Sequence, residues 1–289
     1  MGLPEPPDAG RSALPADTFA GATAFVTGAG TGLGKAIAVE FARLGASIAV
    51  VSRAAEHRAA GVAAVEAAGG KALGVACDVR DAQQVAAAFN AVESELGRPG
   101  ILVNNAAGNF PVAAEDLSPN GWRTVVEIVL HGTFHCSREF GRRHIAAGTP
   151  GAIVNIGASY AWTGGPGFSH SAAAKAGVKN LTETLAVEWA PYGIRVNYLV
   201  PGLFPHQDET ANIRGVPERG QQEDARSPAG RVGRPRELAW ACTFLASPYA
   251  AYVSGATLAV DGANWQRRAM LMPEFKPIRE QLGKPPFEL

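Results

Sequence analysis

Three scarcities narrow what this chain can be. Its three cysteines, Cys77, Cys136 and Cys242, form no C-x-x-C pair, so we expect a reducing compartment and no disulfide framework. No apolar run approaches the roughly 18 residues of a membrane span. Basic and acidic side chains balance at 26 each, which gives no reason to expect nucleic acid or an anionic membrane as a partner.

The two ends of the chain carry no targeting signal that we recognise. The N-terminal stretch MGLPEPPDAG is rich in proline and lacks the apolar region of a secretory signal. The C-terminal stretch KPPFEL is not a peroxisomal address of the S-K-L type. We therefore expect a cytoplasmic protein, with a flexible arm at residues 1–18 and an extension at residues 266–289.

Between these ends, short apolar runs alternate with alanine-rich helical stretches over residues 19–265. The apolar runs predict strands at 22–28, 46–52, 72–79, 100–106, 151–157, 194–202 and 255–262, and the stretches between them predict helices at 32–45, 54–70, 81–97, 115–146 and 172–190. Continuous apolar strands separated by helices are typical of a parallel sheet covered on both faces. The sequence thus predicts a single α/β domain, a doubly wound parallel sheet of Rossmann type. Residues 203–230, which are polar and rich in glycine, proline and arginine, predict a lid.

A glycine-rich turn, TGAGTGLG, joins the first predicted strand to the first predicted helix. Glycines allow the backbone to approach a pyrophosphate, which the helix N-terminus then stabilises. A tight turn without a ligand is the plainer alternative. We assign dinucleotide binding to the residues of this turn: Thr27, Gly28, Gly30, Thr31, Gly32, Leu33 and Gly34.

The second predicted strand ends in Ser52 and Arg53. A guanidinium at this place favours a ribose 2′-phosphate over a 2′-hydroxyl, so we expect NADPH as cofactor unless Arg53 is only a solvated charge. Arg80 is expected to face a phosphate of the cofactor or of the substrate, or only water. Further cofactor contacts are expected where later strands end, at Asp78, Val79, Asn105, Ala106, Ala107, Pro201, Gly202, Leu203 and Phe204.

These features together resemble the short-chain dehydrogenase/reductase family over about residues 20–265. The resemblance rests on T-G-x-x-x-G-x-G at 27–34, N-N-A at 104–106, Lys175, and P-G at 201–202, in the family's order. The family usually reduces carbonyls with a serine, a tyrosine and a lysine. This chain keeps Lys175 but has Ser171 at the tyrosine position and Ala158 at the serine position, so ordinary ketone reduction loses its proton donor.

A second resemblance offers a replacement for that tyrosine. Four motifs together resemble the NADPH-dependent 2,4-dienoyl-CoA reductases: NNAAGNF at 104–110, LSPNGWRTVVEIVLHGTF at 117–134, Y-A-x-T-G at 160–164 and S-A-x-A-K-A-G-V at 171–178. In that subfamily the active-site tyrosine lies upstream, at the position of Tyr160, and a serine matches Ser171. His131 stands where the subfamily has an asparagine that shares the substrate carbonyl with the tyrosine.

The resemblance implies conjugate reduction of an acyl-CoA thioester in unsaturated fatty-acid oxidation, by a homotetramer. Tyr160 and His131 would hydrogen-bond the thioester oxygen, Lys175 would hold the nicotinamide ribose, and Ser171 would orient the substrate or the lysine. Asn109 and Phe110 are expected to line the acyl pocket, and Arg214 in the lid is expected either at a phosphate of CoA or as only a surface charge.

Other interpretations stay open. Tyr160 could simply pack on the next helix. A metal site at His131 and His135 is discounted because no carboxylate partner is evident. A trans-2-enoyl-CoA reductase is the first rival activity, and a 3-ketoacyl or alcohol dehydrogenase is disfavoured by Ser171 and Ala158. A catalytically idle NADPH-binding protein is the alternative outside enzymes.

Overall fold

The sheet is the centre of the fold. The structure, a computed structural model, describes residues 3–205, 228–266 and 278–284. Within these residues, seven strands form one parallel sheet in the order β3-β2-β1-β4-β5-β6-β7. They are β1 (Thr23–Thr27), β2 (Ser47–Ser52), β3 (Ala72–Ala76), β4 (Pro99–Asn104), β5 (Gly151–Ile156), β6 (Ile194–Pro201) and β7 (Thr257–Val260). The predicted doubly wound parallel sheet is confirmed, and its order reverses between β1 and β4.

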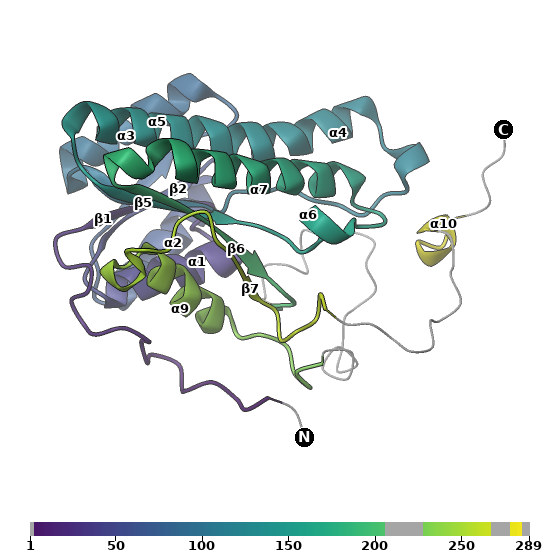
Figure 1. The fold of residues 1–289 in the computed structure, drawn as a ribbon, viewed down its shortest axis with the longest axis horizontal. Helices are drawn as coiled ribbons and strands as arrows, with labels where there is room; N and C mark the ends of the chain where they lie inside the picture. The colour runs from purple at the N-terminus through teal and green to yellow at the C-terminus, as the bar shows by residue number, and fades with distance from the viewer. Residues whose placement is uncertain (1–2, 206–227, 267–277, 285–289) are drawn as a thin grey trace.

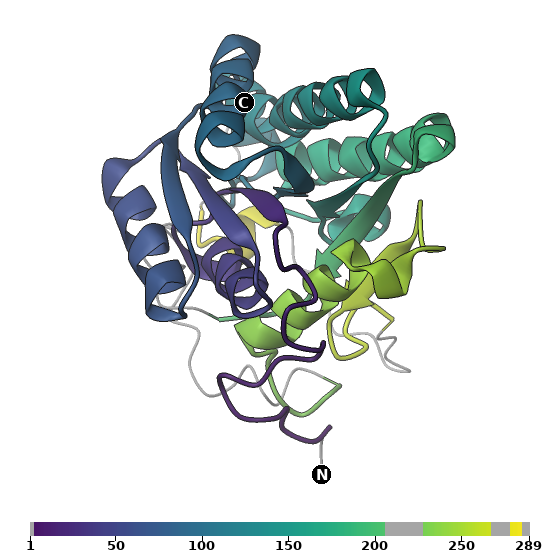
Figure 2. The ribbon, with the colours of Figure 1, turned by 90° about the vertical axis from the view of Figure 1, so that its left-hand side faces the viewer.

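Helices cover both faces of this sheet, as Figures 1 and 2 show. One layer contains α1 (Gly32–Arg43), α2 (Ala55–Ala67) and α9 (Pro235–Ala246). The other contains α3 (Ala82–Leu96), α4 (Pro119–Val126), α5 (Gly132–Ala147) and α7 (Ser169–Trp189). The shorter elements are η1 (Ala114–Asp116), η2 (Glu127–His131), α6 (Tyr160–Thr163), η3 (Ala190–Tyr192), η4 (Pro248–Ala250) and α10 (Ile278–Gln281).

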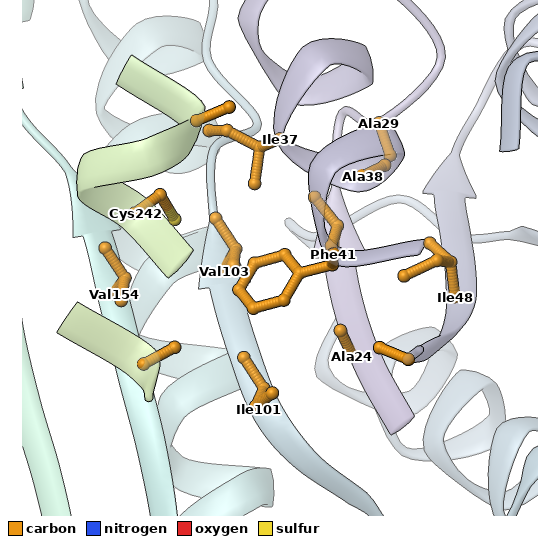
Figure 3. Close-up of a cluster of buried hydrophobic side chains, with 14 of the residues drawn as sticks. Ala24, Ala29, Ile37, Ala38, Phe41, Ile48, Ile101, Val103, Val154 and Cys242 are labelled. Atoms are coloured by element: carbon orange, nitrogen blue, oxygen red, sulfur yellow. The ribbon is translucent and has the colours of Figure 1, made fainter. Parts of the chain in front are cut away.

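The apolar face of α1 fixes the start of the fold. Ile37, Phe41 and Leu44 are fully buried, and Leu33 is partly buried against the same cluster. Figure 3 shows the Phe41 ring among side chains from the strands. Burying one such side chain contributes about 2 kcal/mol, so these three contribute about 6 kcal/mol before the entropy cost of ordering the chain is subtracted. The glycine-rich turn before α1 is held in place by this packing.

Two helical regions differ from the sequence prediction. The long helical region predicted over 115–146 is confirmed from Pro119 onward, where α4, the π-helical turn η2 and α5 follow one another without a gap, but its start differs because residues 117–118 separate η1 from α4. Ser118 starts α4 by accepting a hydrogen bond from the Gly121 N–H at 3.0 Å. No helix was predicted at α9, which begins at Pro235 with a Glu237 carboxylate accepting from the Arg234 N–H.

The described part of the N-terminal arm, residues 3–18, runs alongside α9 and contains no helix or strand. The Pro4 carbonyl accepts from Arg231 at 3.0 Å, and Glu5 pairs with Arg234 at 3.0 Å. The Leu3 N–H donates to the Ala229 carbonyl at 2.7 Å. The arm therefore contacts the end of the predicted lid and the segment that follows it.

A buried polar network joins the middle of the sheet to the helices above it. The Asn104 amide donates to Asn155 Oδ1 at 2.8 Å and to Ser137 Oγ at 3.0 Å. The Asn155 amide donates in turn to Thr182 Oγ1 at 2.9 Å. Since an unpaired buried amide would cost about 1–3 kcal/mol, these pairs favour one registration of β4 and β5 against α5 and α7.

Tyr198, on β6, links two segments that lead to the site. Its side chain is fully buried. The hydroxyl donates to the Lys175 carbonyl on α7 at 3.0 Å and accepts from the Ala158 N–H, just after β5, at 3.2 Å. Gly157 leaves room for the ring, because a Cβ there would lie 2.2 Å from Tyr198 Cζ.

We predict that Gly157→Ala destabilises the fold, because the ring of Tyr198 cannot move aside in a packed core. Such overpacking costs about 3 kcal/mol, which thermal unfolding should detect as a lower Tm. Gly100→Ala is the matched control, since a Cβ there meets no heavy atom within 4 Å. Equal Tm values for the two variants would contradict the prediction.

Candidate active site

The turn between β1 and α1 has the shape that a dinucleotide needs. A Cβ at Gly30 would lie 2.2 Å from the His57 carbonyl oxygen, and one at Gly34 would lie 2.2 Å from the Gly28 carbonyl oxygen. Thr31 makes no side-chain cap at the start of α1, and the first turn has no acidic residue. The positive end of this helix therefore faces a glycine-lined turn that fits a pyrophosphate.

The end of β4 is tied to this turn. The Asn105 amide donates to the carbonyl oxygens of Thr27 and Gly28 at 3.0 and 3.2 Å. The Thr27 hydroxyl accepts from the N–H groups of Asn105 and Ala106, both at 2.9 Å. Val79 and Ala106 line a small hollow beside Thr27, whereas Ala107 is exposed. The predicted cofactor residues at the ends of β1 and β4 therefore lie together.

Two arginines meet at the end of β2. The Arg53 side chain is 58% exposed and lies 3.9 Å from Asp78. The Arg58 guanidinium donates to the carbonyl oxygens of Ser52 and Arg53 at 2.9 and 2.7 Å. Arg58 was not among the residues predicted from the sequence, although its place five residues after Arg53 was the available signal. Both positive charges are placed to favour a phosphate at this strand end.

Arg80 and Asp78 form a tight pair. Arg80 Nε and Nη2 donate to the two Asp78 carboxylate oxygens at 3.0 and 2.6 Å. This pairing with Arg80 holds the pKa of Asp78 below its usual range. Arg80, expected at a phosphate or in water, has its guanidinium on Asp78 in this structure.

After β6 the chain passes back toward the core. Gly202 N–H donates to the Val260 carbonyl at 2.9 Å, and the Leu203 carbonyl accepts from Gly233. Pro201 is partly buried at the end of the strand, and Phe204 is buried in the core cluster that contains Phe41. Arg214 and most of the predicted lid lie outside the described residues.

Tyr160, at the start of α6, and Ser171, on α7, are in contact. The Tyr160 hydroxyl lies 3.0 Å from Ser171 Oγ, and the ring stacks on Phe168 with centroids 6.2 Å apart. Burial raises the pKa of Tyr160, with a smaller opposing effect of Ser171. The phenol therefore stays protonated at neutral pH and can donate a hydrogen bond.

Lys175 lies on the same helix as Ser171, one turn later. Its ammonium donates to the Ile156 carbonyl at the end of β5, and the residue is buried. Burial lowers the pKa of Lys175 to about 8, since the charged form loses its hydration. Ala158, at the family's serine position, is also buried; its N–H donates to Tyr198 and it has no side-chain hydroxyl.

His131 is exposed at the last residue of the π-helical turn. The centroid of its ring lies 6.5 Å from that of His135. His135 Nδ1 lies 3.0 Å from the Val79 carbonyl oxygen. Among the described residues, no group of three or more His, Cys, Asp or Glu side chains has a metal-binding arrangement. The role predicted for His131 at the substrate carbonyl stays a prediction.

The segment around α10 borders the loops that carry the candidate substrate residues. Arg279 and Lys284 each form an ion pair with Asp116, the last residue of η1, at 2.7 Å. Ile278 approaches Gly167, whose carbonyl accepts from the Val112 N–H at 2.9 Å. The loop after Phe110 and the loop before α7 are thus joined directly and through this segment.

Comparison with known proteins identifies the class. A family described as enoyl-(acyl carrier protein) reductase matches residues 28–263. Together with the sheet order and the cofactor turn, this shows that the chain belongs to the short-chain dehydrogenase/reductase family and is an oxidoreductase with a nicotinamide cofactor fold.

Two similar proteins carry the name of a more specific enzyme class. A Bacillus subtilis protein named "probable 2,4-dienoyl-CoA reductase" is 40% identical over 83% of this chain and 95% of its own length. The mouse peroxisomal 2,4-dienoyl-CoA reductase is 38% identical over 92% of this chain and 93% of its own.

Solved structures agree with the fold. A short-chain dehydrogenase from Bacillus anthracis has a TM-score of 0.78 at 41% identity, covering 86% of this chain and 98% of its own. A dehydrogenase from Agrobacterium tumefaciens, solved with bound NADP, has a TM-score of 0.78 at 35% identity, covering 87% and 99%. Separately, none of the helices in the described ranges is long and apolar enough to cross a membrane.

The lowered pKa of Lys175 predicts the alkaline limb of the pH profile. Lys175 is charged below about pH 8 and neutral above it. We therefore expect kcat/KM for the reduced cofactor to fall as pH rises through about 8, since kcat/KM reports the free enzyme. In Lys175→Arg the guanidinium stays charged, so the fall should disappear from the measured range. A fall that persists in this variant would assign it to another group.

Proposed function

We propose that this chain is an NADPH-dependent 2,4-dienoyl-CoA reductase that acts in unsaturated fatty-acid oxidation. The observation that carries the proposal is the contact between Tyr160 and Ser171. Ser171 precedes Lys175 by four residues, which is one turn of the same helix. Position 171, where the family usually has its tyrosine, holds a serine. The phenol of Tyr160 contacts this serine and can therefore supply the hydrogen-bond donor that the family's tyrosine would supply. The names of the relatives from B. subtilis and mouse support the same activity.

The chain's own groups have distinct roles in this proposal. Conjugate reduction puts negative charge on the thioester oxygen, several atoms from the carbon that receives hydride. Tyr160 donates a hydrogen bond to that oxygen, and Ser171 donates to the phenol oxygen behind it. Lys175 would hold the nicotinamide ribose and add positive charge. Bound NADPH would supply the hydride, and water would supply the proton that the α-carbon of the dienolate then needs.

The proposal extends to cofactor choice, location and assembly. Arg53, with Arg58 beside it, favours the 2′-phosphate of NADPH. The cytoplasmic location expected from the sequence stays a prediction, and the mouse relative is named as peroxisomal. A homotetramer would cover the aromatic side chains of Trp122 and Phe134, which are 42% and 45% exposed on α4 and α5.

The substrate proposal is tested by NADPH oxidation with a 2,4-dienoyl-CoA, a trans-2-enoyl-CoA and a 3-ketoacyl-CoA. We expect fast turnover of the diene alone, and about a 100-fold loss in Tyr160→Phe, since one oxyanion donor is removed. Preference for the enoyl thioester would favour the rival reductase. An unchanged rate in Tyr160→Phe would leave Tyr160 as a packing residue. Cofactor binding without turnover would point to the idle protein.

The cofactor proposal is tested separately with Arg53→Ala. We expect KM for NADPH to rise about tenfold, the size of one charge-assisted contact, with KM for NADH unchanged. Arg98→Ala is the control, because that guanidinium pairs with Glu93 next to the start of β4, away from the carboxyl ends. Equal changes for NADPH and NADH would refute a 2′-phosphate contact.

A further inference from the structure

Asn109 brings a second hydrogen-bond donor to the Tyr160 hydroxyl. Its Nδ2 lies 3.5 Å from Tyr160 Oη. Its Oδ1 accepts from the Phe110 N–H at 3.0 Å. Because the backbone N–H can only donate, this bond fixes the carbonyl end of the amide and leaves the NH₂ end toward the phenol.

Two donors at this separation can reach one acceptor. An oxygen placed between Nδ2 and Oη can lie about 2.9 Å from both. We infer that Asn109 is a catalytic residue, whose amide N–H and the Tyr160 O–H together bind the thioester oxygen as it gains negative charge. The inference rests on the proposed function and adds to it the second donor of the oxyanion site.

The surroundings of Tyr160 leave its proton available for this role. The phenol has one proton, and Ser171 Oγ lies within hydrogen-bond distance of the phenol oxygen. When the proton points to a substrate oxygen, the Ser171 hydroxyl can donate in its place. Ser171 is 1% exposed, so water does not compete for that bond.

His131 was expected to be the second donor, but the described contacts favour Asn109. The His131 side chain is exposed, and its recorded ring contact is with His135. No hydrogen bond among the described residues joins it to Tyr160, Ser171 or Lys175. The amide that the resemblance assigns to position 131 is thus supplied, in this chain, from the loop after β4.

The loop that carries Asn109 is held against the loop that follows α6, the short helix that begins at Tyr160. The Val112 N–H donates to the Gly167 carbonyl at 2.9 Å. Beyond it, Asp116 binds Arg279 and Lys284. Since donors act on a developing charge only when they are already in place, these links explain how a loop amide can serve.

The test compares Asn109→Ala, Asn109→Asp and His131→Ala with the wild type on the three thioesters. Asn120→Asp is the control for an asparagine-to-aspartate change, since that amide pairs with Arg123 on the exposed surface of α4. Thermal unfolding of each variant is measured in parallel. Asn109→Asp keeps the size of the side chain, so it decides the question if Asn109→Ala does not fold.

We expect Asn109→Ala to lower kcat and kcat/KM by about 100-fold with KM for the thioester nearly unchanged, because the bond strengthens only as charge develops. Asn109→Asp should be worse at neutral pH, since a carboxylate repels the oxyanion. Its rate relative to the wild type should recover as pH falls and the carboxyl group regains an O–H donor. A residue that only supports the loop would give a ratio independent of pH.

Three results would overturn the inference: an Asn109→Ala rate within about threefold of the wild type, a pH-independent ratio for Asn109→Asp, or a 100-fold loss confined to His131→Ala. If the wild type reduces only the enoyl or ketoacyl thioester, the proposed function fails, but the same variants still decide the role of Asn109 on that substrate's oxygen. If it reduces none of the three, both fail.

Discussion

All seven strands in the described ranges run in parallel, and the rest of the structure follows from the need to bury both faces of their sheet. Each connection must return over one face as a helix, so every strand ends at the same edge. Thr27, Arg53, Asp78 and Asn105 come from four different strand ends and meet there. The burial of Phe41 and its neighbours fixes α1, the helix that follows the cofactor turn, against the sheet.

This constraint explains which features could be predicted from the sequence. The strands and α1 were recognised because apolar residues recur with a clear period, and Ile37 and Phe41 are indeed buried. The interruption at residues 117–118 was missed although Ser118 and Pro119 carry the start signals of α4, and the π-helical turn within the helix could not be foreseen because it keeps helical composition. The helix at α9 was missed although Pro235 and Glu237 carry its start signals.

The sequence predicted which residues belong to the candidate site, but not which of their side chains contact one another. Tyr160 and Ser171 were assigned from a resemblance, and the structure brings their hydroxyls together. That Arg80 binds Asp78 could not be foreseen, because an arginine two residues after a carboxylate reaches it only when the intervening backbone turns. Tyr198 was missed for a similar reason: its pattern is that of any buried strand residue, and its role depends on what its hydroxyl reaches across the sheet.

Lys175 is where local stability and chemistry conflict. A pKa of about 8 instead of 10.5 means that the charged form is disfavoured by about 3 kcal/mol in the folded protein. Because the unfolded chain binds this proton more tightly, the contribution of Lys175 to stability rises as pH increases from about 8 to 10.5 and is least favourable at neutral pH. A methionine would avoid that cost. The ammonium instead donates to the Ile156 carbonyl, with Tyr198 holding the same turn of α7. A buried charge with no carboxylate partner among the residues that the structure describes is difficult to explain by folding alone, and a bound anionic or polyhydroxylated ligand is a partner that would account for it.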